Sequence, residues 1–185
     1  MTTASRSVCV FCGSRYGSDP AWRGAAEDLG RGIAEAGWQL VYGAGDVGLM
    51  GAVANAAQAG GADTLGVIPI HLLSHEKGRR DLTRFVVTEN MHERKKVMFM
   101  NSDAIVVLPG GAGTLDEFFE VLTWRQLGLH AKPIHLLNVA GYWDPLLRLI
   151  DSVIATGFAE PSLRAFVEAP DTVAACLSRL GAQLS

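Results

Sequence analysis

Short apolar runs alternate with amphipathic helical patterns along the whole chain of 185 residues. This alternation is typical of α/β proteins, in which helices cover both faces of a mainly parallel sheet. The sequence therefore predicts a three-layer, doubly wound, Rossmann-like fold with right-handed crossovers, formed by one domain over residues 1–185. The expected strands are Ser7–Cys12, Trp38–Tyr42, Asp63–Ile68, Phe85–Thr88, Ala104–Leu108, Pro133–Leu137 and Phe166–Glu168, and the expected helices are Pro20–Ala36, Val47–Ala59, Met91–Asn101, Leu115–Leu127, Trp143–Ala155 and Asp171–Leu184.

Composition and charge exclude several classes of protein. Hydrophobic residues make up 49% and charged residues 19% of the chain, which suits a packed core and excludes a disordered chain. The formal net charge of −3 disfavours a general nucleic-acid-binding protein. No apolar run reaches the roughly 18 residues that a membrane span needs, and no signal-peptide pattern follows the polar start. We expect a soluble, cytoplasmic protein that binds neither nucleic acid nor membrane.

Cysteines and histidines do not form a metal motif in this sequence. Cys9 and Cys12 are three residues apart on an expected strand, where their side chains point to opposite faces. Cys176 is alone, and no second pair completes a zinc site. His71 and His75 lie four residues apart in an irregular stretch without an HExxH pattern, which indicates loop histidines. We expect no metal and no cofactor, and the odd number of cysteines fits a reducing compartment.

Ligands of doubly wound sheets bind beyond the carboxyl ends of the strands, so the residues after each strand carry the functional signal. Gly13-Ser14-Arg15 follows the first expected strand, and the GxGxxG pattern Gly43–Gly48 follows the second. A dinucleotide fold has this pattern after its first strand, with an acidic residue about 20 positions later at a strand end. Neither condition holds, which disfavours an NAD-dependent oxidoreductase. The pattern is then either a plain tight turn or a turn that faces a phosphate or sugar.

The strongest motif is PGGAGTLDE at Pro109–Glu117, which follows an entirely apolar strand. Its three glycines allow the backbone to approach an anion, and it opens a helix whose free N–H groups carry partial positive charge. A Walker A loop is excluded because no GK[ST] follows. Thr114 and Glu117 also match a capping box, so a helix cap without a ligand is the alternative.

A cluster of cations opens the preceding helix, in the segment Met91–Lys96. Cations at a helix start oppose the helix dipole and repel one another. Arg94 and Lys95 point about 100° apart round the helix, so both can line one rim. An anionic ligand would offset the cost, and a solvated basic patch is the alternative. Upstream, Glu76 lies in the polar stretch His71–Arg84, which breaks the strand–helix alternation and is a candidate active-site loop.

With these motifs, the chain resembles the Lonely Guy (LOG) family of cytokinin riboside 5′-monophosphate phosphoribohydrolases. The resemblance runs from VCVFCGSR to the GYWDPLL helix and centres on MHERK at 91–95, PGGAGTLDE at 109–117 and TWRQLGLHAKP at 123–133. It implies hydrolysis of the N-glycosidic bond of a nucleoside 5′-monophosphate, with release of adenine or an N6-substituted adenine and ribose 5-phosphate. Ala112 stands where many members have Tyr, and Ala44 where many have Gly, so the resemblance implies the chemistry but does not define the shape of the base pocket or the substrate range.

The resemblance makes Arg94 and Glu117 the catalytic pair. Glycosidic cleavage passes through an oxocarbenium-like sugar, which an ionised Glu117 near C1′ would stabilise or supply with activated water. Arg94 stays charged, so we assign it to the charge on the phosphate or on the departing base, and no residue is an obvious proton donor to that base. The expected substrate-binding residues are Ser14, Gly43, Glu76, Met91, Arg94, Lys95, Gly110, Gly111, Ala112, Gly113, Thr114, Leu115, Asp116, Glu117 and Thr123.

Thr123 lies six residues after Glu117, about 120° round the same helix. It reaches the same pocket only if the pocket wraps the helix or is shared between subunits. The resemblance implies a homodimer, which fits the second possibility.

Two other functions share parts of these motifs. A non-catalytic carrier of a nucleotide or of the molybdenum cofactor uses the same PGGxGT loop, but it gains nothing from a carboxylate such as Glu117 beside an anionic phosphate. Chains of this kind are also labelled lysine decarboxylases. A pyridoxal enzyme needs a Schiff-base lysine in a recognisable setting, which none of the four lysines has: Lys77, Lys95, Lys96 and Lys132.

Overall fold

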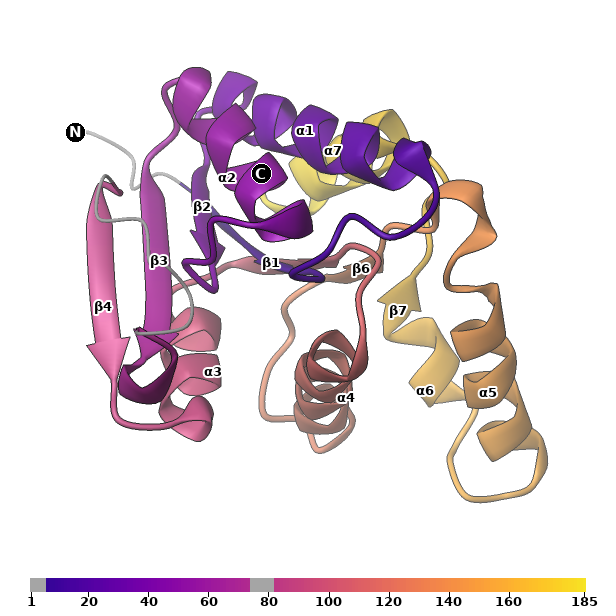
Figure 1. Ribbon diagram of the computed structural model, residues 1–185. Helices are drawn as coiled ribbons and strands as arrows, with labels where there is room; N and C mark the ends of the chain where they lie inside the picture. Colours follow the sequence, from indigo (N-terminus) through magenta and orange to yellow (C-terminus); the bar gives the residue numbers. More distant parts are fainter. Residues whose placement is uncertain (1–5, 74–81) are drawn as a thin grey trace.

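One seven-stranded parallel sheet forms the middle layer of the protein (Figure 1). The computed structural model describes residues 6–73 and 82–185. The strands are β1 (Ser7–Phe11), β2 (Gln39–Tyr42), β3 (Thr64–Pro69), β4 (Arg84–Thr88), β5 (Ala104–Val107), β6 (Ile134–Leu136) and β7 (Val167–Glu168). Their order is β4-β3-β2-β1-β5-β6-β7, and every neighbouring pair is parallel. The order reverses at β1, between β2 and β5, as in a doubly wound sheet.

Helices cover both faces of this sheet (Figure 1). One face carries α1 (Pro20–Glu35), α2 (Gly48–Ala59) and α7 (Val173–Gln183), and the other carries α3 (Met91–Met100), α4 (Ala112–Gln126), α5 (Asp144–Ala155) and α6 (Ser162–Ala165). Two short 3₁₀ helices, η1 (Ile70–Leu72) and η2 (Val139–Gly141), lie in the connections. This arrangement confirms the predicted three-layer α/β fold. Within residues 6–73 and 82–185, no helix is long and apolar enough to cross a membrane.

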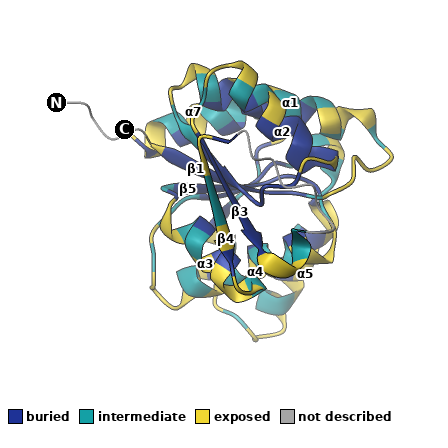
Figure 2. Ribbon diagram, turned by 60° about the vertical axis from the view of Figure 1, so that its left-hand side comes forward, coloured by how far each residue is buried: buried dark blue, intermediate teal, exposed yellow. Residues whose placement is uncertain are grey.

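The sheet divides the core into two hydrophobic clusters, because successive side chains of each strand point to opposite faces. In β1, Val8 and Val10 pack in the cluster under α1 and α2, whereas Cys9 and Phe11 pack in the cluster over α3 and α4. Figure 2 shows these central strands buried between helices whose outer faces are exposed. Cys12 belongs to the opposite cluster from Cys9, so the two thiols diverge as predicted. The three cysteines are free and buried.

Helix α4 begins at Ala112, three residues earlier than predicted. Its N-cap is Gly111, whose backbone is extended. A glycine has no side chain, so no side-chain hydrogen bond caps this helix. Thr114 therefore lies inside the first turn, and the capping box with Glu117 that the sequence offered as an alternative is wrong. Glycine disfavours helix interiors, which is why the sequence placed the start after Gly113, but the cost is small in a first turn. The short elements α6, η1 and η2 carry too little periodic pattern to be predicted.

Candidate active site

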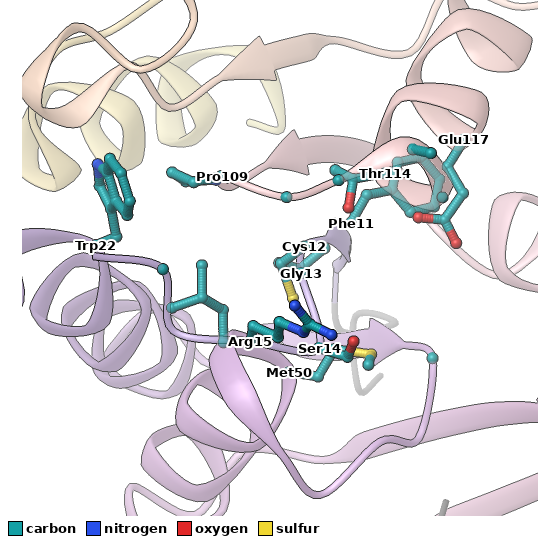
Figure 3. A pocket seen from close by; sticks show the side chains of 18 of the residues that line it. Phe11, Cys12, Gly13, Ser14, Arg15, Trp22, Met50, Pro109, Thr114 and Glu117 are labelled. Carbon is teal, nitrogen blue, oxygen red and sulfur yellow. The ribbon is translucent and has the colours of Figure 1, made fainter. Parts of the chain in front are cut away.

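A cavity of about 530 Å³ opens at the carboxyl ends of β1, β2 and β5 (Figure 3). Three loops form it: the segment after β1, the turn from β2 into α2, and the glycine loop from β5 into α4. This is the place where a doubly wound sheet binds its ligand, at the point where the strand order reverses.

The three loops touch one another through their backbones. The amide of Gly13 donates a hydrogen bond to the carbonyl of Pro109 (3.0 Å), and the amide of Leu49 donates one to the carbonyl of Gly13 (3.1 Å). Gly48 has a φ of +60°, and a Cβ atom there would overlap the backbone after Ser14. A Cβ atom at Gly110 would overlap the side chain of Thr114 in the same way. These glycines are required by the close approach of the loops.

The N-terminus of α4 faces the cavity. Gly111, Ala112, Gly113 and Thr114 all line it. The first intrahelical bond runs from the amide of Leu115 to the carbonyl of Gly111 (3.0 Å). The amides before it have no helical partner and carry the positive end of the helix dipole, so this loop suits an anion such as a phosphate.

Glu117 lies one turn further along the same helix, and its half-buried side chain lines the cavity. Burial raises the pKa of this carboxyl to about 7, and the charge of Arg94 offsets part of that rise. Among the described residues, none makes a hydrogen bond or ion pair with the Glu117 carboxylate, so it is available to a ligand. A carboxyl with a pKa near neutrality in a cleft is typical of a general base or acid.

Arg94 is held in the cavity wall by backbone carbonyls. Its Nε donates to the carbonyl of Val67 (3.0 Å) and its Nη2 to the carbonyl of Gly43 (2.7 Å), and the side chain is 6% exposed. A Cβ atom at Gly43 would overlap Nη2 of Arg94, so a glycine is needed here to seat the guanidinium. Because these partners are neutral, the positive charge of Arg94 stays available to an anionic ligand or a developing negative charge.

Lys95 points away from the cavity. Its buried ammonium group pairs with the carboxylates of Asp116 (2.9 Å) and Glu120 (3.1 Å), which lie on α4. Arg94 and Lys95 are thus both buried, and the alternative of a solvated basic patch is wrong for these two side chains. The pairing joins α3 to α4 and keeps the two helices that carry Arg94 and Glu117 together.

Comparison with known proteins gives a consistent family. Residues 50–180 match the family model described as "Possible lysine decarboxylase". The probable cytokinin riboside 5′-monophosphate phosphoribohydrolase LOGL9 of rice (Oryza sativa subsp. japonica) is 50% identical over 167 residues, which are 90% of this chain and 74% of the rice protein. The chain belongs to the Lonely Guy (LOG) family. The phosphoribohydrolase LOG3 of Arabidopsis thaliana is 42% identical over 175 residues, 95% of this chain and 81% of that protein.

Solved structures with the same fold include molybdenum-cofactor proteins. The Moco carrier protein of Chlamydomonas reinhardtii superposes with a TM-score of 0.75 at 21% identity, covering 98% of this chain and 99% of that one. The molybdenum cofactor binding protein of Rippkaea orientalis gives the same score and identity over 100% of both chains. At this identity the likeness establishes the shared fold and no more.

The decarboxylase label of the family model finds no support in the cavity. The ammonium group of Lys95 pairs with Asp116 on α4, and Lys96 does not line the cavity. Lys132 donates to the carbonyl of Phe99. Lys77 lies outside the described residues. The described part of this LOG-family chain therefore offers no lysine in the cavity for a Schiff base, and no three of its His, Cys, Asp or Glu side chains come together to hold a metal ion.

The structure brings most of the predicted site residues to this cavity and leaves others outside. Leu115, Lys95 and Asp116 do not line it, and Thr123 is exposed, with its hydroxyl donating to the carbonyl of Phe119 (2.7 Å). Glu76 and His75 lie outside the described residues, and His71 lies exposed in η1. The predicted residues that line the cavity are Ser14, Gly43, Met91, Arg94, Gly110, Gly111, Ala112, Gly113, Thr114 and Glu117.

Sequence reasoning missed several residues of the cavity wall. Arg15 belongs to the segment Gly13-Ser14-Arg15 that the strand-end rule singled out, but only Ser14 of that segment was assigned to the substrate. Met50 and Met98 join Met91 in an apolar, polarisable surface near Arg94 that suits a planar base. The other missed residues include Tyr16 and Trp22, which come from segments without a motif, and Tyr142, which lies in the GYWDPLL segment where the resemblance ends.

Glu117→Gln tests the burial of this carboxyl through the pH dependence of stability. The unfolded chain releases the proton near the usual pKa of 4.5, whereas the folded protein keeps it up to about pH 7. Ionisation in the folded state therefore lowers the free energy of unfolding as the pH rises through this interval. We expect Glu117→Gln to raise the free energy of unfolding by about 1–3 kcal/mol at about pH 8 and to leave it unchanged at about pH 4.

Denaturant unfolding of both proteins at the two pH values measures the difference. The matched control is Glu160→Gln, which makes the same substitution at an exposed carboxylate outside the cavity. A change for Glu117→Gln that is equal at both pH values would show that burial does not raise the pKa of Glu117.

Proposed function

We propose that this protein hydrolyses the N-glycosidic bond of adenosine 5′-monophosphates, N6-substituted ones included, and releases free base and ribose 5-phosphate. The observation that carries the proposal is the half-buried Glu117 carboxyl, with a pKa of about 7, one turn beyond an anion-binding helix N-terminus. The names of its relatives, cytokinin riboside 5′-monophosphate phosphoribohydrolases at 42–50% identity, support the same reaction.

The 5′-phosphate binds at the N-terminus of α4. The free amides of this helix start attract the anion, and the glycines leave room for its oxygens to approach the backbone. Ser14 lines the opposite side of the cavity. A phosphate held there puts the ribose next to Glu117 and the base against the methionine surface near Arg94.

In the reaction, the bond between C1′ and the base nitrogen breaks, and its electron pair leaves with the base. The sugar becomes oxocarbenium-like, and ionised Glu117 stabilises this charge and takes a proton from the water whose oxygen bonds to C1′. With a pKa of about 7, the protonated carboxyl can pass the proton on to the departing base. Arg94 stabilises the negative charge that develops on that base, since its own hydrogen bonds go to neutral carbonyls.

The oligomeric state and the location of the protein stay predictions. We infer a homodimer, because exposed Phe119, Leu127 and Leu129 give α4 and its end an apolar outer surface near Thr123. In such a dimer Thr123 can reach the partner's nucleotide, which a single chain does not allow. A single domain and a cytoplasmic location remain as the sequence predicts them.

The direct test is incubation of the purified protein with AMP, N6-isopentenyl-AMP and the matching nucleosides. We expect chromatography to show free base from the monophosphates and none from the nucleosides, because the glycine loop binds the phosphate. Glu117→Gln should lower kcat by at least about 100-fold while AMP binding remains. Bound AMP with no base released from any compound would reject the hydrolase and favour a carrier.

Gly43→Ala tests whether the seat of Arg94 matters for the chemistry. The new Cβ atom would displace the guanidinium, and we expect kcat to fall about 10- to 100-fold, with a much smaller change in KM. Gly24→Ala is the matched control, because a Cβ atom there meets open space on α1. Full activity of Gly43→Ala would show that Arg94 needs no such positioning.

A further inference from the structure

The cavity continues past the glycine loop on the side away from Glu117. In Figure 3, Trp22 and Glu117 lie at opposite ends of the pocket, and Pro109, Gly13 and Arg15 lie between them. The end near Glu117 is the one that the proposed function uses. The other end, which we call the aromatic end, is lined by Tyr16, Trp22 and Tyr142.

At the aromatic end, the polar atoms of Trp22 and Tyr142 already have partners in the protein. Trp22 and Tyr142 meet edge to face with ring centroids 5.0 Å apart. The indole Nε1 of Trp22 donates to the carbonyl of Val139 (3.3 Å), and the hydroxyl of Tyr142 donates to the carbonyl of Gly110 (2.7 Å). What the two rings offer to the cavity is therefore apolar aromatic surface, which suits a flat group.

Arg15 adds a positive charge between the two ends. It is exposed, and it forms no hydrogen bond or ion pair with another residue of the described segments. Arg94, by contrast, gives two donors to backbone carbonyls. The middle of the cavity thus combines the exposed guanidinium of Arg15 with the N-terminus of α4, two separate groups that each attract phosphate oxygens.

A nucleoside monophosphate does not use this whole arrangement. Its phosphate is at one terminus, so when C1′ is next to Glu117 and the phosphate is on the glycine loop, nothing reaches Trp22. A ligand that fills the cavity has its anionic part in the middle and a planar group at each end.

We propose that the pocket also binds pyrophosphate-linked dinucleotides, with the pyrophosphate between the glycine loop and Arg15 and the second planar group against Trp22 and Tyr142. The orientation of the first nucleotide rests on the proposed function. The aromatic end itself, with its fixed rings and neighbouring cation, does not.

Isothermal titration of the Glu117→Gln protein with AMP, ADP and P1,P2-di(adenosine-5′) pyrophosphate tests this binding without turnover. We expect the dinucleotide to bind roughly 10-fold more tightly than ADP, because stacking of one base on an aromatic side chain is typically of this size. Trp22→Leu in the same background should bring the two affinities close together, and Trp22→Phe should keep most of the difference. Arg15→Ala should weaken ADP and the dinucleotide more than AMP.

Trp38→Leu is the matched control, since this half-buried tryptophan precedes β2 at the other end of the sheet and does not line the cavity. Equal binding of ADP and the dinucleotide, or a preference that survives Trp22→Leu, would overturn the proposal. Turnover of AMP by the unmodified protein is read separately. Turnover of AMP without a preference for the dinucleotide would support the hydrolase and reject the second subsite. A preference for the dinucleotide without turnover of AMP would support the second subsite and reject the hydrolase.

Discussion

Where β1 and β5 end, the amide of Gly13 donates a 3.0 Å hydrogen bond to the carbonyl of Pro109, and the amide of Leu49 donates to the carbonyl of Gly13. These bonds hold three loops at backbone distance, which is possible only because Gly48 and Gly110 have no side chain. The glycines thus act first on the protein itself. By joining the loops they fix the N-terminus of α4 over the cavity, and with it the free amides that the ligand meets there.

The chemistry depends on the pKa of Glu117, which burial and the charge of Arg94 shift in opposite directions. Burial favours the neutral carboxyl, and Arg94 favours the ionised one, with a resulting pKa of about 7. Arg94 can act in this way because it is bound by carbonyls instead of carboxylates. Lys95, its neighbour in sequence, has the opposite role: its charge is neutralised by Asp116 and Glu120, and it joins α3 to α4. Of these two adjacent cations, Arg94 therefore presents its charge to the ligand, whereas Lys95 stabilises the packing of α3 against α4.

The sequence predicted the layers, the strand locations and the glycine loop, because these depend on local apolar patterns and on glycine itself. It placed the start of α4 too late, because Gly113 argues against helix while the loop geometry allows it in a first turn. It placed Lys95 beside Arg94 in the substrate-binding set, since the helix periodicity allows both to line the cavity until α4 is placed. Trp22 and Tyr142 reach the cavity only through packing between segments 120 residues apart, for which no local pattern exists.

The central claim is that one cavity holds the phosphate on the glycine loop and C1′ beside Glu117. A crystal structure of the Glu117→Gln protein with AMP bound tests it most directly. The account predicts the phosphate on the amides at the start of α4 and C1′ within about 3–4 Å of the substituted side chain, a reacting distance. A phosphate away from this helix start, or a nucleotide reversed so that its base rests on Trp22 with C1′ far from residue 117, would contradict it.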